Sequence, residues 1–159
     1  MHITFAPRGI LQIDDATLIF KNFTGRGDKF NREGDKNFAI RIFDREDADR
    51  LIEDTNRDGE GWNVKIKPPR EEGDDPFMYL QVKVKFNDRG PRVVLLVGDK
   101  KVELDEESIA CLDDIEIERV DLDIRPYDSS VSGKPFRAAY LEKMYVTQRV
   151  DRFIERYEM

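Results

Sequence analysis

The chain has almost none of the residues from which metal sites and nucleophilic active sites are built. Its 159 residues include one cysteine, Cys111, and one histidine, His2. A single cysteine cannot form an internal disulfide and is typical of a reducing compartment. The usual zinc sites, which need four Cys or His ligands, cannot form within one such chain. A Ser–His or Cys–His pair would have to use a histidine beside the N-terminus. We therefore expect no enzyme, no metal and no other cofactor.

Long apolar runs are also missing. No segment approaches the roughly 20 apolar residues of a membrane helix, and the start, MHITFAPRGI, lacks a signal-peptide core. We expect a soluble, cytoplasmic protein with no membrane partner. The length suits one domain with its own hydrophobic core, and no repeat or low-complexity tract divides it. We expect a single domain over residues 1–159, with a core at about 17–147.

A net charge of −7 argues against a nucleic-acid partner, but the charge is sorted along the chain. Residues 17–45 hold seven basic and four acidic side chains, and residues 78–101 hold six and two. Residues 102–123 hold one basic and ten acidic side chains. Such blocks can fold into a basic groove on an acidic body, or they can simply form a solvated charged surface.

The hydrophobic pattern predicts a mostly β fold with two or three short helices. Alternating, β-branched segments predict strands at 17–23, 37–43, 62–67, 77–86, 92–97, 115–125 and 137–147. Helices are expected at 44–56, with Asp44 as N-cap, at 105–112 and at 150–157. The segment 77–97 reads as a hairpin, and a phase shift at Arg119 indicates a bulge. Short strands and short helices favour a small β-barrel or curved sheet over a parallel α/β fold.

Basic and aromatic side chains share the expected outward faces of these strands. Proteins that hold single strands combine cationic grooves with aromatic platforms for the bases. The strand residues with this character are Arg41, Phe43, Lys65, Lys67, Tyr79, Lys83 and Lys85. Lysines at such positions also protect sheet edges from pairing, so the pattern alone leaves both interpretations open.

Two predicted loops carry the same combination. The loop 24–36 surrounds one aromatic ring with cations: Arg26, Lys29, Phe30, Arg32 and Lys36. Phe30 could stack on a base, or fold back as a plug on the core. A loop at about 128–136 presents Tyr127, Lys134 and Phe136, with packing beneath the loop as the alternative for Tyr127. We expect Trp62, which opens a strand, in the core.

Paired carboxylates raise one catalytic alternative. Asp121 and Asp123 share a predicted strand face, as do Glu116 and Glu118. Such pairs can hold magnesium for phosphodiester cleavage. No lysine or histidine stands beside them at convincing spacing, so a solvated acidic face is the preferred interpretation. An acidic face also suits a protein-interaction module of OB type, for example a phage factor that binds a host or replication protein.

Several phrases resemble the single-stranded DNA-binding proteins of tailed phages and prophages: KFN-x-EGD-x-NF, GWNVK and IRPY, within a likeness over about 18–147. The resemblance implies an OB-fold, no cofactor, no catalysis, and coating of single-stranded DNA in phage replication or recombination. It also implies phage or host replication proteins as partners. The tail VDRFIERYEM departs from the acidic tails of many such proteins. Its predicted helix either docks on the body or pairs two subunits as a homodimer.

Overall fold

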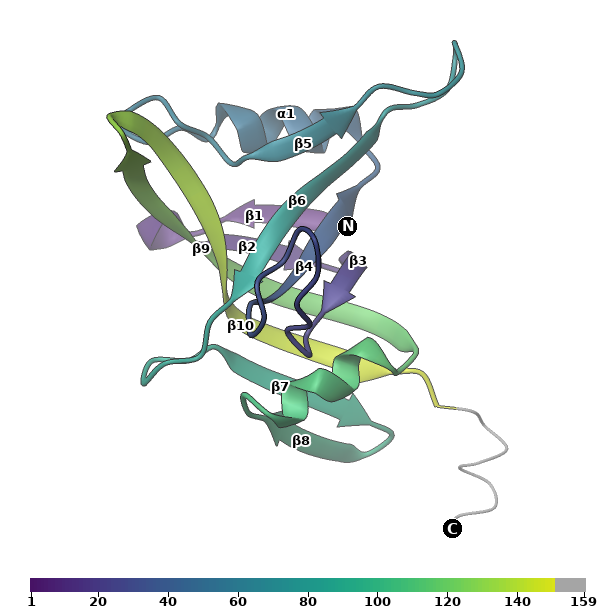
Figure 1. Cartoon of the computed structure of the whole chain (residues 1–159). Helices are drawn as coiled ribbons and strands as arrows, with labels where there is room; N and C mark the ends of the chain where they lie inside the picture. The colour runs from purple at the N-terminus through teal and green to yellow at the C-terminus, as the bar shows by residue number, and fades with distance from the viewer. Residues whose placement is uncertain (151–159) are drawn as a thin grey trace.

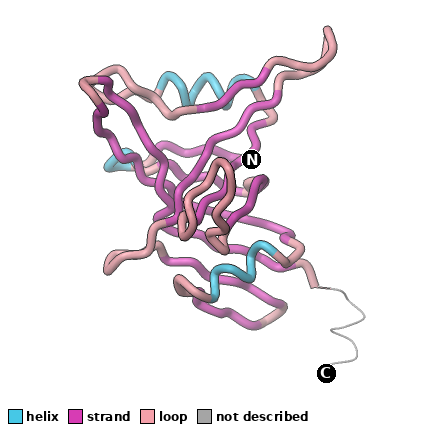
Figure 2. Tube along the Cα trace, in the orientation of Figure 1, coloured by secondary structure: helices cyan, strands magenta, loops and turns pink. Residues whose placement is uncertain are grey.

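The computed structural model describes residues 1–150, and most of this range is β-strand, as expected (Figure 2). The strands are β1 (His2–Phe5), β2 (Leu11–Asp14), β3 (Thr17–Asn22), β4 (Lys36–Ile42), β5 (Val64–Lys67), β6 (Phe77–Val84), β7 (Arg92–Val97), β8 (Lys100–Leu104), β9 (Ile117–Val131) and β10 (Lys134–Gln148). The helices are η1 (Pro7–Gly9), α1 (Arg45–Glu53) and η2 (Ser108–Asp113). The helix predicted at 150–157 lies outside the described residues.

One sheet contains all ten strands, and β10 is its centre (Figure 1). The main path runs β1-β2-β9-β10-β6-β4-β3, with β5 on β6 and β8 on β7. β9 pairs antiparallel with β10 along nearly its whole length. The other edge of β10 takes two parallel neighbours in succession, first β6 and then β7. β10 therefore fixes how three parts of the chain are placed relative to one another.

Within residues 1–150 the sheet does not close into the predicted barrel. β1 and β3 end the strand path, and no ladder joins them. A backbone hydrogen bond from the Ala16 N–H to the Val120 carbonyl (2.8 Å) bridges the opening beside β3. The fold is thus an open, curved sheet with short helices.

The predicted hairpin over 77–97 is wrong. The tight turn is present, since Asn87 and Gly90 exchange backbone hydrogen bonds of 2.8 and 3.1 Å. After the turn, however, β7 does not return along β6 but pairs in parallel with β10. Its hairpin partner is β8, which the sequence pattern did not reveal. β10 has a long edge along which β6 and then β7 pair. β7 therefore pairs with β10, which is distant in sequence, and not with the adjacent strand β6.

The N-terminal segment is also more ordered than the pattern suggested. β1 pairs with β2, and β2 pairs with β9 over Leu11, Gln12 and Ile13. Ile3, Leu11 and Ile13 are all buried. The buried core therefore starts well before the first predicted strand at residue 17. β1 has one buried residue and β2 has two, so neither strand shows an extended alternation.

The loop predicted at about 128–136 is instead the tip of a long hairpin. Ser132 and Gly133, both with positive φ (52° and 78°), form the two-residue turn between β9 and β10. Positive φ at both positions is what a tight hairpin turn requires. Residues 125–131 and 134–140 form a two-stranded arm, which reaches the segment after α1 (Figure 1).

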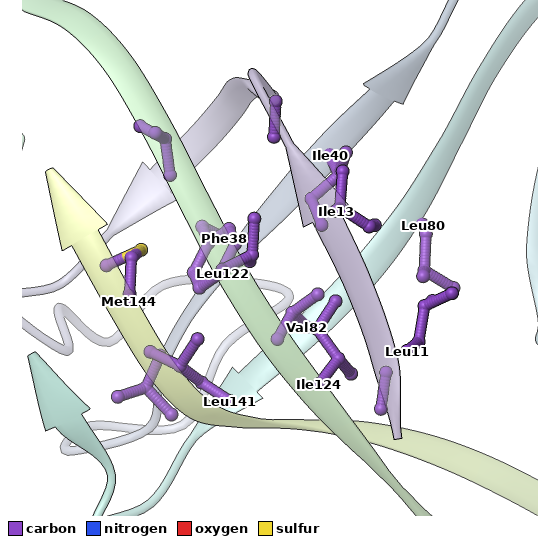
Figure 3. Close-up of a cluster of buried hydrophobic side chains, with 14 of the residues drawn as sticks. Leu11, Ile13, Phe38, Ile40, Leu80, Val82, Leu122, Ile124, Leu141 and Met144 are labelled. Atoms are coloured by element: carbon purple, nitrogen blue, oxygen red, sulfur yellow. The ribbon is translucent and has the colours of Figure 1, made fainter. Parts of the chain in front are cut away.

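Alternation predicted the core correctly. Phe38, Ile40, Leu80 and Val82 interlock with side chains of β2, β9 and β10 (Figure 3). Burial of each such side chain contributes about 1.5–3 kcal/mol. Trp62 is 2% exposed, as expected of a core residue, and its indole N–H donates to Asp54.

Local sequence signals were also largely correct. The Asp44 carboxylate caps α1 by accepting from the Glu46 N–H (2.9 Å). The expected irregularity near Arg119 is a register shift at Glu118, opposite the Thr147–Gln148 step of β10. In the described part of the chain, no helix has the length and apolar character needed to cross a membrane.

Candidate nucleic-acid interface

A groove of about 1440 Å³ lies between the loop 24–35, here called the basic loop, and the outward face of β6. Figure 1 shows this loop in front of β6 and β4. Its basic lining residues are Lys21, Arg26, Arg32, Lys36, Lys67, Lys83 and Lys85, against three acidic ones, Asp28, Asp35 and Glu106. Its aromatic lining residues are Phe20, Phe30, Tyr79, Phe86 and Tyr140. A chain with net charge −7 thus gathers a local excess of positive charge in one concavity.

Eight of the fifteen residues predicted from sequence line this groove: Arg26, Phe30, Arg32, Lys36, Lys67, Tyr79, Lys83 and Lys85. The loop and β6 are separate in sequence, and the pattern could not show that they face each other. β4 brings them together, because it follows the loop directly and pairs with β6 from Lys36 to Ile42.

The basic loop is held at its base by a carboxylate from η2. Asp113 accepts hydrogen bonds from the Phe23 N–H (2.8 Å), the Thr24 N–H (2.9 Å) and the Thr24 hydroxyl (2.6 Å). Burial alone would raise the pKa of Asp113, but these hydrogen bonds hold it below its ordinary value. The anchor is therefore ionised at neutral pH, and it weakens only as the pH falls through this lowered pKa.

A ladder of side-chain amides ties the loop to the sheet. Gln81 on β6 donates to the Asn37 oxygen (2.9 Å), and Asn37 donates to the Asn31 oxygen (2.9 Å). Asn31 in turn donates to the carbonyls of Arg26 (2.8 Å) and Asp35 (3.0 Å). The loop is therefore a braced wall of the groove, and a ligand would meet it already in place.

Phe30 stands at the rim of this wall with 91% of its surface exposed, so it does not plug the core. The Lys29 ammonium lies 5.7 Å from its ring centroid. Lys36 has a different role: its ammonium donates to the Phe23 and Thr24 carbonyls (3.0 and 3.4 Å) and fastens the loop. Of the predicted loop residues, Lys36 is therefore the least available to a ligand.

One aromatic cluster lies on the outward face beside Tyr79. The rings of Phe20 and Phe77 lie 5.4 and 5.7 Å from Tyr79, and the Lys67 ammonium lies 5.8 Å from it. Phe20 sits at a bulge of β3 with φ +51° and is 58% exposed. A left-handed conformation is costly for a bulky residue, and such strain gathers at binding sites. Sequence analysis missed Phe20 because the bulge breaks the alternation.

A second aromatic cluster lies where the arm meets β6. Tyr127 packs edge-on against Tyr140 (5.8 Å) and beside Phe136 (6.4 Å), and it is 48% exposed. Lys83 and Arg125 place their cations 6.0 and 5.1 Å from the Tyr140 ring. Strand register explains this meeting, since Tyr140 pairs with Lys83 on one side and Arg125 on the other. Tyr140 and Arg125 were also missed, because no local pattern reveals a parallel pairing.

The remaining predicted residues are not among those that line the groove. The Arg41 guanidinium lies between the rings of Phe43 (4.7 Å) and Phe77 (5.1 Å), which extends the first cluster. Lys65 is the strand partner of Tyr79 on the edge strand β5. Lys134 lies at the tip of the arm.

One carboxylate of the pair considered for magnesium, Asp121, is engaged in structural contacts. Asp121 accepts from the Asp15 N–H (2.9 Å) and from Arg119 (3.2 Å). Asp123 on β9 is the strand partner of Lys143 on β10, and burial raises the pKa of Asp123. The described residues contain no group of three or more His, Cys, Asp or Glu side chains that could hold a metal ion.

Comparisons with known proteins concern the fold and the family of the chain. No curated protein matches the chain. Three solved structures of the single-stranded DNA-binding protein from bacteriophage Enc34 share its fold. The structure in complex with ssDNA has a TM-score of 0.56 at 16% identity, covering 95% of this chain and 93% of that one. The C-terminal truncation has a TM-score of 0.55 at 13% identity, covering 94% and 91%.

The third structure has a TM-score of 0.56 at 13% identity, covering 95% of this chain and 87% of that one. At sequence identities this low, the structural similarity shows a common fold and nothing more. The sequence itself matches a family model described as "Putative phage ssDNA-binding domain" over residues 3–159. Because this match spans nearly the whole chain, the protein belongs to the phage single-stranded DNA-binding domain family.

Proposed function

We propose that this protein binds single-stranded DNA in the groove between the basic loop and β6, and that it coats DNA strands during phage replication or recombination. One observation carries the proposal: seven basic residues and exposed aromatic rings line one concavity of an otherwise acidic protein. Cations track the phosphates while rings stack on bases, which tolerates any sequence. The similar Enc34 protein has been solved in complex with ssDNA.

The arrangement favours unpaired strands over duplex. The aromatic clusters around Tyr79 and Tyr140 present rings at the sheet surface, and only an unpaired strand has free base faces for them. We propose that the protein acts without catalysis, as a single OB-related domain in the host cytoplasm. The engagement of Asp121 by Arg119 and Asp15 supports a non-catalytic role.

Fluorescence anisotropy with a labelled oligo-dT at several salt concentrations tests the proposal. The logarithm of the binding constant falls with the logarithm of the salt concentration, and each phosphate contact contributes about 0.7 to this slope for single strands. About five contacts therefore predict roughly 100-fold weaker binding at 200 mM than at 50 mM salt. Duplex DNA should compete poorly. Salt-independent binding, or no binding at low salt, would contradict the proposal and turn attention to a protein partner for the acidic face.

Replacing Phe30 by alanine should weaken oligo-dT binding by about 1–3 kcal/mol, the usual cost of removing one base–aromatic stack. The fold should be unaffected because Phe30 is 91% exposed. Phe5, which is 39% exposed on β1 and does not line the groove, is a matched control. Equal affinity of Phe30→Ala and Phe5→Ala would remove Phe30 from the interface.

A further inference from the structure

In the part of β10 that follows the groove residue Tyr140, one side of the strand faces the core and the other faces away from it. Its core-facing residues are Leu141, Met144 and Val146. The register shift at Glu142 adds one residue to β10 opposite the Asp123–Ile124 step of β9. Because of this bulge, Tyr140 and Tyr145 both lie on the side of β10 that faces away from the core. Without it, strict alternation would place Tyr145 on the inner side.

Tyr145 repeats the chemistry found at Tyr140. The ammonium groups of Lys143 and Lys101 lie 5.3 and 5.8 Å from its ring centroid. Lys101 comes from β8, so two strands converge on one ring. Among the ion pairs of residues 1–150, none uses either lysine. Both cations are therefore free to meet a phosphate.

Two of the acidic side chains near this ring are held in ion pairs. Glu103 pairs with Arg92 (3.5 Å), and Asp121, the strand partner of Tyr145, is bound by Arg119. Asp123, the strand partner of Lys143, forms no ion pair within residues 1–150. The pairs of Glu103 and Asp121 therefore offset part of the negative charge around Tyr145.

We propose that Tyr145, Lys101 and Lys143 form a second contact for single-stranded DNA, which holds the part of the strand that has left the groove at Tyr140. The inference rests on the proposed function of the groove. Tyr145 follows Tyr140 by five positions on β10, which corresponds to roughly 16 Å at about 3.3 Å per residue. A strand must extend past Tyr140 by this distance to reach both rings.

Oligonucleotide length separates the two contacts. We would compare dT of about 4 nucleotides, the lower end of the roughly 4–16 that one such fold occupies, with dT of about 30. The variants are Tyr145→Leu, which keeps an apolar cover over the sheet, and the double variant Lys101→Gln/Lys143→Gln. The charge-matched control is Arg57→Gln/Lys100→Gln, which changes two exposed cations away from the ring.

Tyr145→Leu should weaken binding of the long oligonucleotide at least about fivefold and leave the short one unchanged. The lysine variant should make the salt slope for the long oligonucleotide shallower by about 1.4, and the control should not. Unchanged binding of both lengths would overturn the second contact and leave the lysine stems as a mere cover for Tyr145. Equal weakening of both lengths would also overturn it. If the wild-type protein bound neither length, the groove proposal itself would fall, and this one with it.

Discussion

Replacing Tyr79 and Tyr140 together by alanine is expected to weaken oligo-dT binding by about 2–6 kcal/mol, the largest loss from any pair of substitutions in the groove. Each ring belongs to a different aromatic cluster, so the variant removes both stacking platforms at once. Loss of one stack costs about 1–3 kcal/mol, and contributions of sites without shared partners add. Anisotropy with the two single variants alongside measures the sum.

Phe5→Ala again serves as the control for loss of an exposed ring, and thermal unfolding monitored by circular dichroism verifies folding. A folded double variant that binds within twofold of the wild type would show that these rings do not stack on bases. A loss confined to Tyr79→Ala would restrict the interface to the first cluster.

Replacing Arg137 by alanine should lower the free energy of unfolding by about 3 kcal/mol. Only 8% of its side chain is exposed. It donates to both Asp128 oxygens (2.7 and 3.3 Å) and to the Asp54 carbonyl (2.8 Å), and it lies 5.1 Å from the Trp62 ring. Breaking a buried ion pair costs about 3–5 kcal/mol, and the lower figure applies because Asp128 remains 35% exposed.

Urea unfolding measures this effect, and Arg45→Ala is the control, since its pair with Asp49 is exposed and should contribute about 0.3–0.5 kcal/mol. The hydrogen bonds from Arg137 lower the pKa of Asp128. The stability gained from the pair should therefore be complete above the ordinary aspartate pKa and decrease as the pH falls through the lowered value. A difference between wild type and Arg137→Ala that is unchanged in acid would mean that packing on Trp62 carries the effect.

The parts of the fold that depend on local pattern were predictable. Alternation assigned Phe38, Ile40 and Val82 to the core, and Lys83 to the solvent side. The combination of cations with Phe30 drew attention to the loop whose residues Arg26, Phe30 and Arg32 line the groove. Both results rest on periodicity or composition within a dozen residues, where the physical signal is strongest.

The parts that depend on distant pairing or on bulges were not predictable. Tyr140 meets Lys83 only because two strands far apart in sequence run in parallel. Phe20 and Tyr145 face outward because bulges shift the phase of β3 and β10. A bulge adds one unpaired residue. The apolar pattern revealed the bulge beside Arg119 but neither of these two.

The central position of β10 also bears on when the protein can fold during synthesis. β7 and the arm strand β9 each have one edge that β10 covers, and one edge of β2 is covered by β9, since Leu11 pairs with Ile124. Ribosomes add about 5–20 residues per second, so the early strands spend several seconds with unpaired edges. A nascent chain that stops before residue 134 would lack Tyr140 and the centre of its sheet. Such a fragment should aggregate rather than bind DNA. Folding and the ability to bind DNA would therefore both arise only near the end of synthesis.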